Sequence, residues 1–122
     1  MAQDLLNFAH APYSNFQVAA IIQDDKNQIH SGVNVENAAY PLGTCAEAGA
    51  IAAMIAKGGT SISQIIILGA SDEICTPCGG CRQRIAEFAN QESMIICTNR
   101  HGHPIKTYRI HDLLPDRFKL DE

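Results

Sequence analysis

Three of the five cysteines are spaced so that they could hold one metal ion. Cys78 and Cys81 form a Cys-x-x-Cys pair, and Cys45 stands earlier in the chain, directly before Ala46-Glu47. Such a pair at the junction of a loop and a helix can direct two thiolates at one centre, and the positive helix N-terminus lowers their pKa. Because Cys45 lies at the start of a second expected helix, two helix N-termini could converge on one ion. Three protein ligands leave one tetrahedral position open for water, which is typical of a catalytic zinc site.

Glu47 follows Cys45 by two residues, within the first turn of the expected helix. There its carboxylate could take a proton from water at the metal and later hand it to a leaving group, without being a ligand itself. The spacing from Thr44 to Glu47 is also that of a capping box, which would give Glu47 a structural role only. The adjacent cysteine favours the chemical interpretation.

The same cysteines allow other interpretations. Cys75, Cys78 and Cys81 are each three apart, as in a bacterial iron–sulfur run, but no fourth Cys-Pro follows. Cys-Gly-Gly-Cys also resembles a thioredoxin-type redox pair, which would leave the Cys-Ala-Glu motif unexplained. A closed structural zinc site needs a fourth ligand, and His101 and His103 are expected to be exposed in a surface turn. Cys75 is then a loop thiol near the site.

Hydrophobic periodicity predicts the elements that position these residues. In chain order they are a short helix that includes 5–9 and ends near Pro12, strands over 18–22 and 29–35, a helix over 44–57, a strand over 65–68, a helix over 81–89, strands over 94–97 and 105–109, and a short helix ending at 113–115. The first two strands form a hairpin, and Thr44 and Gly58-Gly59 delimit the first long helix. The strand over 65–68 is apolar on both faces and therefore central, and Cys97 is expected in the core. This order predicts one mixed sheet with helices packed against it.

Composition and charge favour a folded protein that binds a small molecule. The 122 residues are 46% hydrophobic and 18% charged, enough for one domain over 1–122 with a core that needs no disulfides. A net charge of −4 and no run of Lys or Arg argue against nucleic acid as the partner. No apolar run approaches the roughly 20 residues that span a membrane, and no signal-peptide pattern opens the chain. We therefore expect a cytoplasmic protein whose cysteines serve a metal.

The pairing of Cys45-Ala46-Glu47 with Pro77-Cys78-x-x-Cys81 resembles the zinc-dependent cytidine deaminases, whose wider signature has His or Cys as the first ligand. Further matching segments are 11–16 (APYSNF), 32–40 (GVNVENAAY) and 113–118 (LLPDRF), so the resemblance covers nearly the whole chain. Within that family, the chain resembles the small form whose zinc ligands are three cysteines. That form implies a three-layer α/β/α sandwich with a mixed five-stranded sheet, one zinc ion per chain, and a homotetramer.

The resemblance implies hydrolytic deamination of cytidine and 2′-deoxycytidine to uridine and 2′-deoxyuridine, with release of ammonia, in pyrimidine salvage. Zinc on Cys45, Cys78 and Cys81 would activate water for addition to C4, and Glu47 would move the proton to N3 and then to the departing amine. A deaminase of a modified nucleoside such as blasticidin S shares these motifs. A non-catalytic zinc or redox module and a polynucleotide cytosine editor are the alternatives from other classes, the latter disfavoured by the acidic charge.

Substrate contacts are implied position by position. Asn34 and Glu36 match residues that hydrogen-bond the ribose hydroxyls, where a carboxylate beside an amide suits a 3′-hydroxyl. Strand alternation alone would make both an exposed polar face. Phe16 matches the residue that stacks on the pyrimidine, although a lone Phe is more often a core residue.

Three further contacts follow from the same resemblance. The backbone N–H of Ala46, together with Glu47, would contact the edge of the pyrimidine ring. Tyr40 and Phe118 match residues that close the pocket from neighbouring subunits, so each active site would be shared.

One position departs from the family pattern. The family often has Arg directly after the catalytic Glu, where it hydrogen-bonds the zinc thiolates, and this chain has Ala48. Three thiolates on a divalent ion leave a net negative centre, which makes water at the metal harder to ionise. We expect Arg82, directly after the last ligand, and the two helix N-termini to offset part of that charge.

Overall fold

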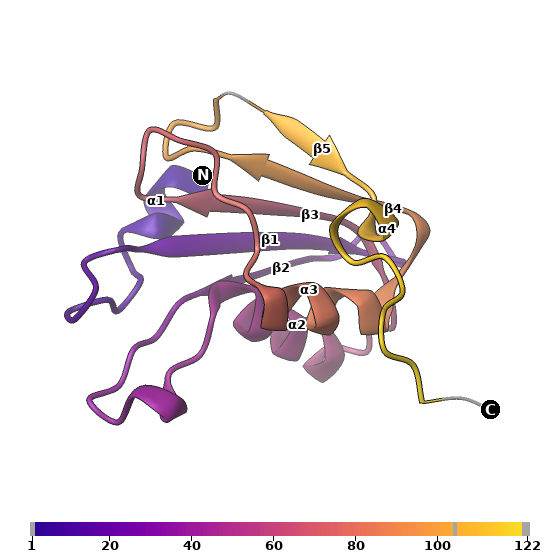
Figure 1. Ribbon diagram of the computed structural model, residues 1–122, viewed down its shortest axis with the longest axis horizontal. Helices are drawn as coiled ribbons and strands as arrows, with labels where there is room; N and C mark the ends of the chain where they lie inside the picture. The colour runs from indigo at the N-terminus through magenta and orange to yellow at the C-terminus, as the bar shows by residue number, and fades with distance from the viewer. Residues whose placement is uncertain (1, 104, 121–122) are drawn as a thin grey trace.

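The computed structural model describes residues 2–103 and 105–120. In chain order the elements are α1 (Ala2–Leu6), β1 (Val18–Asp24), β2 (Ile29–Val33), the short 3₁₀ turn η1 (Tyr40–Leu42), α2 (Ala46–Ala56), β3 (Ile62–Gly69), α3 (Gly79–Phe88), β4 (Ala89–Thr98), β5 (Lys106–Tyr108) and α4 (Ile110–Leu113) (Figure 1). No helix among these residues is both long and apolar enough to cross a membrane.

The strands form one mixed sheet in the order β2-β1-β3-β4-β5, which confirms the predicted architecture. β1 pairs antiparallel with both β2 and β3, β3 runs parallel to β4, and β5 returns antiparallel to β4. The isoleucine-rich β3 is the middle strand, as its apolar residues on both faces predicted. A parallel pair needs a crossover between its strands, and α3 provides it between β3 and β4.

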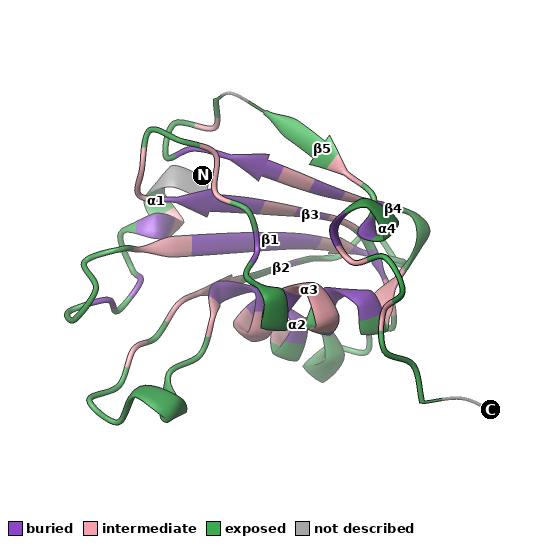
Figure 2. Cartoon of the chain, viewed as in Figure 1, coloured by how far each residue is buried: buried purple, intermediate pink, exposed green. Residues whose placement is uncertain are grey.

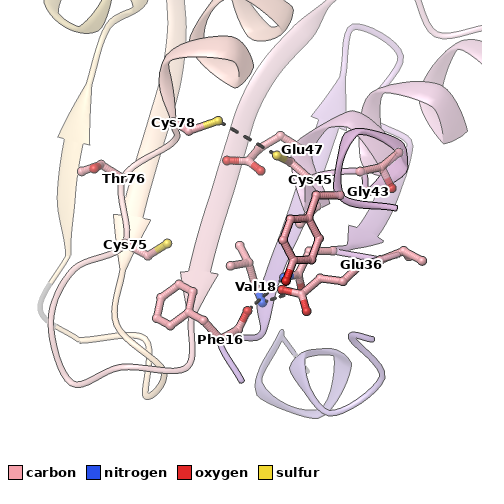
Figure 3. Close-up of a pocket in the computed structure, with 14 residues that line it drawn as sticks. Phe16, Val18, Glu36, Gly43, Cys45, Glu47, Cys75, Thr76 and Cys78 are labelled. Atoms are coloured by element: carbon pink, nitrogen blue, oxygen red, sulfur yellow. Dashed lines mark hydrogen bonds between the residues drawn. The ribbon is translucent and has the colours of Figure 1, made fainter. Parts of the chain in front are cut away.

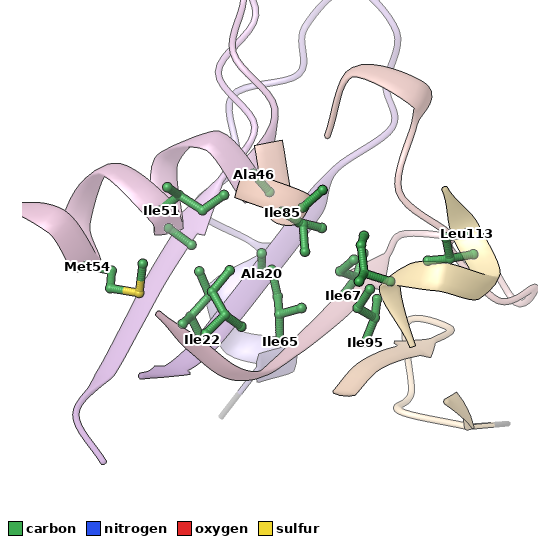
Figure 4. Packing of buried hydrophobic residues seen from close by; sticks show 14 of the residues in the cluster. Ala20, Ile22, Ala46, Ile51, Met54, Ile65, Ile67, Ile85, Ile95 and Leu113 are labelled. Carbon is green, nitrogen blue, oxygen red and sulfur yellow. The ribbon is translucent and has the colours of Figure 1, made fainter. Parts of the chain in front are cut away.

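Helices cover the two faces of the sheet unequally. Ala19 and Ala20 are neighbours on β1 and therefore point to opposite faces. Ala19 belongs to a small cluster with Leu6 of α1 and Leu68 of β3. Ala20 belongs to the main core beneath α2, α3 and α4 (Figures 2 and 4). That core consists of Ala20, Ile22, Ala46, Ala50, Ile51, Met54, Ile62, Ile65, Ile67, Ile85, Ala86, Ile95, Cys97, Ile110 and Leu113.

Helix α2 begins later than its sequence predicted. Cys45 is its N-cap residue and no side chain caps the helix, so the expected Thr44–Glu47 capping box is wrong. Thr44 exchanges two backbone hydrogen bonds with Val35 instead, which keeps it in an extended conformation. As a result Cys45, rather than Thr44, stands at the helix N-terminus. At the other end, Gly58 adopts a left-handed φ of 89° and closes the helix, as expected.

The backbone of α2 lies directly against that of β2. A Cβ atom on Gly32 of β2 would lie 2.4 Å from the Ala50 nitrogen and 2.5 Å from the Ala46 oxygen, distances that real contacts do not reach. Gly49 faces the same contact from the helix, but its Cβ would come no closer than 3.6 Å, to the Gly32 Cα. Gly32 therefore sets how closely the site-bearing helix approaches the sheet.

We expect Gly32→Ala to lower the free energy of unfolding by about 1–3 kcal/mol, because the added methyl forces two backbones apart. The matched variant is Gly49→Ala, which should leave stability unchanged or raise it by about 0.5–1 kcal/mol, since alanine favours a helix interior. Denaturant unfolding of both variants measures the difference. Equal effects from the two substitutions would contradict this account of the contact.

Candidate active site

The three predicted metal ligands come together where two helices begin. Cys45 is the N-cap residue of α2, Cys78 is the N-cap residue of α3, and Cys81 lies in the first turn of α3. Their sulfur atoms all lie within 4.8 Å of one another, and those of Cys45 and Cys78 are 4.0 Å apart (Figure 3). The expected convergence of two helix N-termini is therefore present.

The separation of the sulfurs fits a zinc ion. A tetrahedral zinc bonded at about 2.3 Å to each sulfur holds its sulfurs about 3.8 Å apart, close to the distance between Cys45 and Cys78. Among the described residues, these cysteines are the cluster of three or more ligand-type side chains that could hold a metal. Cys75 is not part of it, and His101 and His103 are exposed in their turn, as expected. The cluster thus has the open, three-ligand form of a catalytic site.

The thiols differ in how readily they ionise. Burial raises the pKa of Cys45 and of Cys81, and for Cys81 the negative charges of Glu47 and Cys45 add to the effect. The pKa of Cys78 is lowered, chiefly because the backbone N–H of Cys81 donates to its sulfur. The expectation of a lowered pKa for both members of the Cys-x-x-Cys pair is therefore wrong for Cys81, where burial outweighs the helix N-terminus. A bound cation would favour all three thiolates and release their protons.

Glu47 places a carboxylate at this centre. It is the second residue of α2 and is only 4% exposed. Figure 3 draws its carboxylate beside the sulfurs of Cys45 and Cys78. Burial raises the pKa of Glu47, and the backbone, Cys81 and Arg84 offset only part of the rise. A carboxyl group with a raised pKa is suited to both accepting and delivering protons.

A cavity of about 350 Å³ opens onto Cys45, Cys78 and Glu47, within the size range of small-molecule sites. Five of the six expected substrate residues line it, and Phe118 does not. The Phe118 residue is 71% exposed and its carbonyl accepts a hydrogen bond from Gln83. The full lining is Phe16, Val18, Asn34, Val35, Glu36, Tyr40, Gly43, Thr44, Cys45, Ala46, Glu47, Cys75, Thr76 and Cys78.

Asn34 fixes the segment that carries Phe16. Its Nδ2 donates to the Phe16 carbonyl at 2.9 Å, and its Oδ1 accepts from the Val18 N–H at 2.9 Å. Each amide atom still has one hydrogen-bonding position free, because the amide nitrogen carries two hydrogens and the oxygen two lone pairs. Asn34 can therefore hold Phe16 at the cavity wall and also face a ligand.

Glu36 holds the preceding part of the same loop. Its Oε1 accepts from the backbone N–H groups of Tyr13 and Ser14 at 2.9 and 3.1 Å, and its Oε2 accepts from the Ser14 hydroxyl. The Ser14 hydroxyl and these N–H groups lower the pKa of Glu36, so it is ionised at neutral pH. Asn34 and Glu36 therefore both hydrogen-bond to the loop, unlike the solvated polar face that strand alternation alone would predict.

Two arginines follow the last cysteine on α3. Arg82, which was expected to offset part of the charge of the cluster, donates to the carbonyls of Pro77 and Leu113 at 2.9 and 3.1 Å. Arg84 instead places Nη1 3.5 Å from the Cys81 sulfur. Sequence reasoning missed Arg84, although residues three apart share one face of a helix.

Cys75, which was expected to be a loop thiol near the site, also turns its side chain into the cavity. It lines the cavity, and burial raises its pKa to about 11, so it is a neutral thiol there. Its position three residues before Cys78 was the available signal, but spacing alone does not say whether a loop side chain turns into a cavity.

Comparisons with known proteins agree with this geometry. A family model described as the cytidine and deoxycytidylate deaminase zinc-binding region matches residues 1–98. Cytidine deaminase of Mycobacterium tuberculosis is 36% identical over 114 residues, covering 93% of this chain and 81% of that protein. Cytidine deaminase of Mycoplasma genitalium is also 36% identical, over 118 residues, covering 96% of this chain and 89% of that protein.

Solved structures give the same result. The crystal structure of a cytidine deaminase from Burkholderia pseudomallei has a TM-score of 0.88 and 34% identity, over 96% of this chain and 93% of that one. The cytidine deaminase structure from Mycobacterium tuberculosis has a TM-score of 0.84 and 34% identity, over 98% and 92%. With the family model covering most of the sequence and relatives similar along nearly all of it, this chain belongs to the zinc-binding cytidine and deoxycytidylate deaminase family.

Proposed function

We propose that this protein is a zinc-dependent hydrolase that converts cytidine and 2′-deoxycytidine to uridine and 2′-deoxyuridine with release of ammonia. The observation that carries the proposal is the buried carboxylate of Glu47 beside three converging cysteine sulfurs, on the wall of a cavity of suitable size. The named relatives, which are cytidine deaminases, support the same reaction.

Cys45, Cys78 and Cys81 would hold one zinc ion. When bound, zinc supplies a Lewis acid that lowers the pKa of water and so provides a nucleophile at neutral pH. Glu47 would accept the proton from that water and deliver it to N3 of the pyrimidine as oxygen adds to C4. It would then transfer the second proton of the water, from the hydroxyl now on C4, to the amino nitrogen. The C4–N4 bond would break, C4 would become a carbonyl carbon, and ammonia would leave.

The cavity wall would hold the nucleoside in place for these transfers. The Phe16 ring would stack on the pyrimidine, and the Ala46 N–H would contact the edge of the ring. Asn34 and Glu36, which also line the cavity, would bind the ribose hydroxyls. Positioning of this kind fixes the distance between C4 and the water that attacks it, which is a large part of the rate enhancement.

We expect the purified protein to contain about one zinc per chain and to convert cytidine, followed by ultraviolet absorbance. Glu47→Gln should retain zinc and fold while losing about 10²–10⁴-fold in kcat, because the amide cannot carry the proton. Glu87→Gln, on the exposed surface of α3, is the matched control and should match the parent protein.

Full activity in Glu47→Gln would remove Glu47 from the proton path. Zinc without turnover on cytidine or 2′-deoxycytidine would contradict the proposed substrates and direct the search to modified nucleosides. Protein with neither zinc nor turnover, kept reduced and away from chelators, would contradict the proposed reaction itself.

Asn34 and Glu36 could bind the ribose, hold the Phe16 loop, or do both. A substrate without the 2′- and 3′-hydroxyls distinguishes the two roles. If these side chains bind the 3′-hydroxyl, Asn34→Ala and Glu36→Gln should lower kcat/KM for cytidine by about 10–100-fold, the strength of one or two such hydrogen bonds. The same variants should affect 2′,3′-dideoxycytidine far less. Equal losses with both nucleosides would mean that the residues only hold the Phe16 loop. Ser14→Ala is the control for that loop, because it removes a partner of Glu36 that does not line the cavity.

We propose that the protein is a homotetramer in which neighbouring subunits complete each active site. Tyr40 is 77% exposed although it lines the cavity, and Phe118, 71% exposed, lies outside the cavity of its own chain. Large exposed aromatic side chains beside a site are typical of surfaces that another protein covers. Phe118 would close the cavity of an adjacent subunit.

Light scattering should give a mass four times the 13.2 kDa of one chain. Phe118→Ala should lose activity, and mixing it with Glu47→Gln under conditions that exchange subunits should restore part of it, because each variant supplies what the other lacks. A monomer in solution, or no recovery in tetramers shown to contain both chains, would contradict a shared site.

The cellular setting follows from the proposed chemistry. Free cysteines that serve a metal suit a reducing compartment, so we propose that the protein works in the cytoplasm. The reaction would convert cytosine nucleosides to uridine and 2′-deoxyuridine for reuse, which is pyrimidine salvage. We propose that residues 1–122 act as one catalytic domain, since one sheet contains strands from both ends of the chain, β1 and β5.

A further inference from the structure

With a zinc ion bound, the metal-ligand cluster would carry an excess of negative charge. Three thiolates exceed the charge of a divalent ion by one, and the Glu47 carboxylate lies beside them. Charges of one sign held close together are costly unless a cation or hydrogen-bond donors offset them. The site therefore needs a positive group close to the sulfurs.

Arg84 is placed to be that group. It follows Cys81 by three residues on α3, and its Nη1 donates to the Cys81 sulfur at 3.5 Å. Among the hydrogen bonds of the described residues, no other nitrogen-bearing side chain donates to any of the three sulfurs. Arg82 is nearer in sequence, but its guanidinium is occupied by two backbone carbonyls.

The backbone around Arg84 leaves room for this contact. A Cβ atom on Gly80 would lie 3.4 Å from Arg84 Nη1, so the guanidinium passes close to the Gly80 backbone on its way to the cluster. Neither Arg84 nor Cys81 lines the cavity, whereas Cys45 and Cys78 do. Arg84 thus reaches the cluster without entering the space where substrate would bind.

We propose that Arg84 is a positioning residue that supplies the counter-charge of the metal centre and stabilises the three thiolates when zinc is bound. The proposal rests on the proposed function for its effect on turnover, but not for its effect on zinc binding. Loss of the charge should weaken zinc binding, because Arg84 would offset the negative charge that three thiolates leave on the zinc-loaded cluster. It should also lower kcat, because a more negative centre makes water at the metal harder to ionise.

The test compares Arg84→Lys, Arg84→Gln and Arg84→Glu, measured by competition for zinc with a chromophoric chelator and by steady-state kinetics. Two opposite charges a few ångströms apart near a protein surface interact strongly enough to change binding about tenfold after allowance for solvent screening. We therefore expect zinc affinity about tenfold lower in Arg84→Gln, lower still in Arg84→Glu, and largely restored in Arg84→Lys. Losses in kcat should follow the same order with KM little changed.

The glutamine and glutamate variants have nearly the same shape, so a difference between them reports charge rather than packing. Arg100→Gln is the control, because it makes the same change in net charge at an exposed pair with Asp72. Cys78→Ser gives the reference for loss of a ligand. Equal zinc affinity across the Arg84 series, or equal losses in the glutamine and glutamate variants, would overturn the proposal. Chelator competition remains decisive even if the parent protein does not act on cytidine, which would instead count against the proposed function.

Discussion

The convergence of three ligand sulfurs and one buried carboxylate on a single point is the constraint on which the rest of the structure depends. Cys45, Cys78 and Cys81 lie within 4.8 Å of one another with Glu47 beside them, and the pKa values of Cys81 and Glu47 are raised in consequence of burial. Side chains from segments far apart in the sequence meet at one point only when the backbone holds them there. Here two helices that begin at the same place over one sheet provide that restraint.

The restraint comes from backbone contacts more than from side chains. Gly32 lets α2 rest directly on β2, and the extended pairing of Thr44 with Val35 delivers Cys45 to the start of that helix. The parallel pairing of β3 with β4 requires a crossover, and α3 within it carries the other two sulfurs. The same loop that pairs with Thr44 also bears Asn34 and Glu36, so the metal centre and the cavity wall share one support (Figure 1).

Charge at the centre is arranged differently from what the position after Glu47 suggests. The family often places Arg there, and this chain has Ala48. The guanidinium instead approaches from α3, through Arg84 and the Cys81 sulfur. Helix α3 therefore contributes two of the sulfurs and the cation beside them, while α2 contributes one sulfur and the carboxylate. Such a division keeps the cation out of the cavity and leaves Glu47 free to face it.

The sequence by itself determined the mixed sheet, the order of its elements and the identity of the residues gathered at the site, because hydrophobic periodicity and the Cys-Ala-Glu and Cys-x-x-Cys motifs are local signals. It did not determine where α2 begins, which arginine meets the sulfurs, or that Cys75 lines the cavity. Those outcomes depend on contacts between distant segments, such as Thr44 with Val35 and Arg82 with Leu113. Only the tertiary structure decided them, because the start of a helix and the direction of a side chain depend on which hydrogen-bond partners the fold brings close.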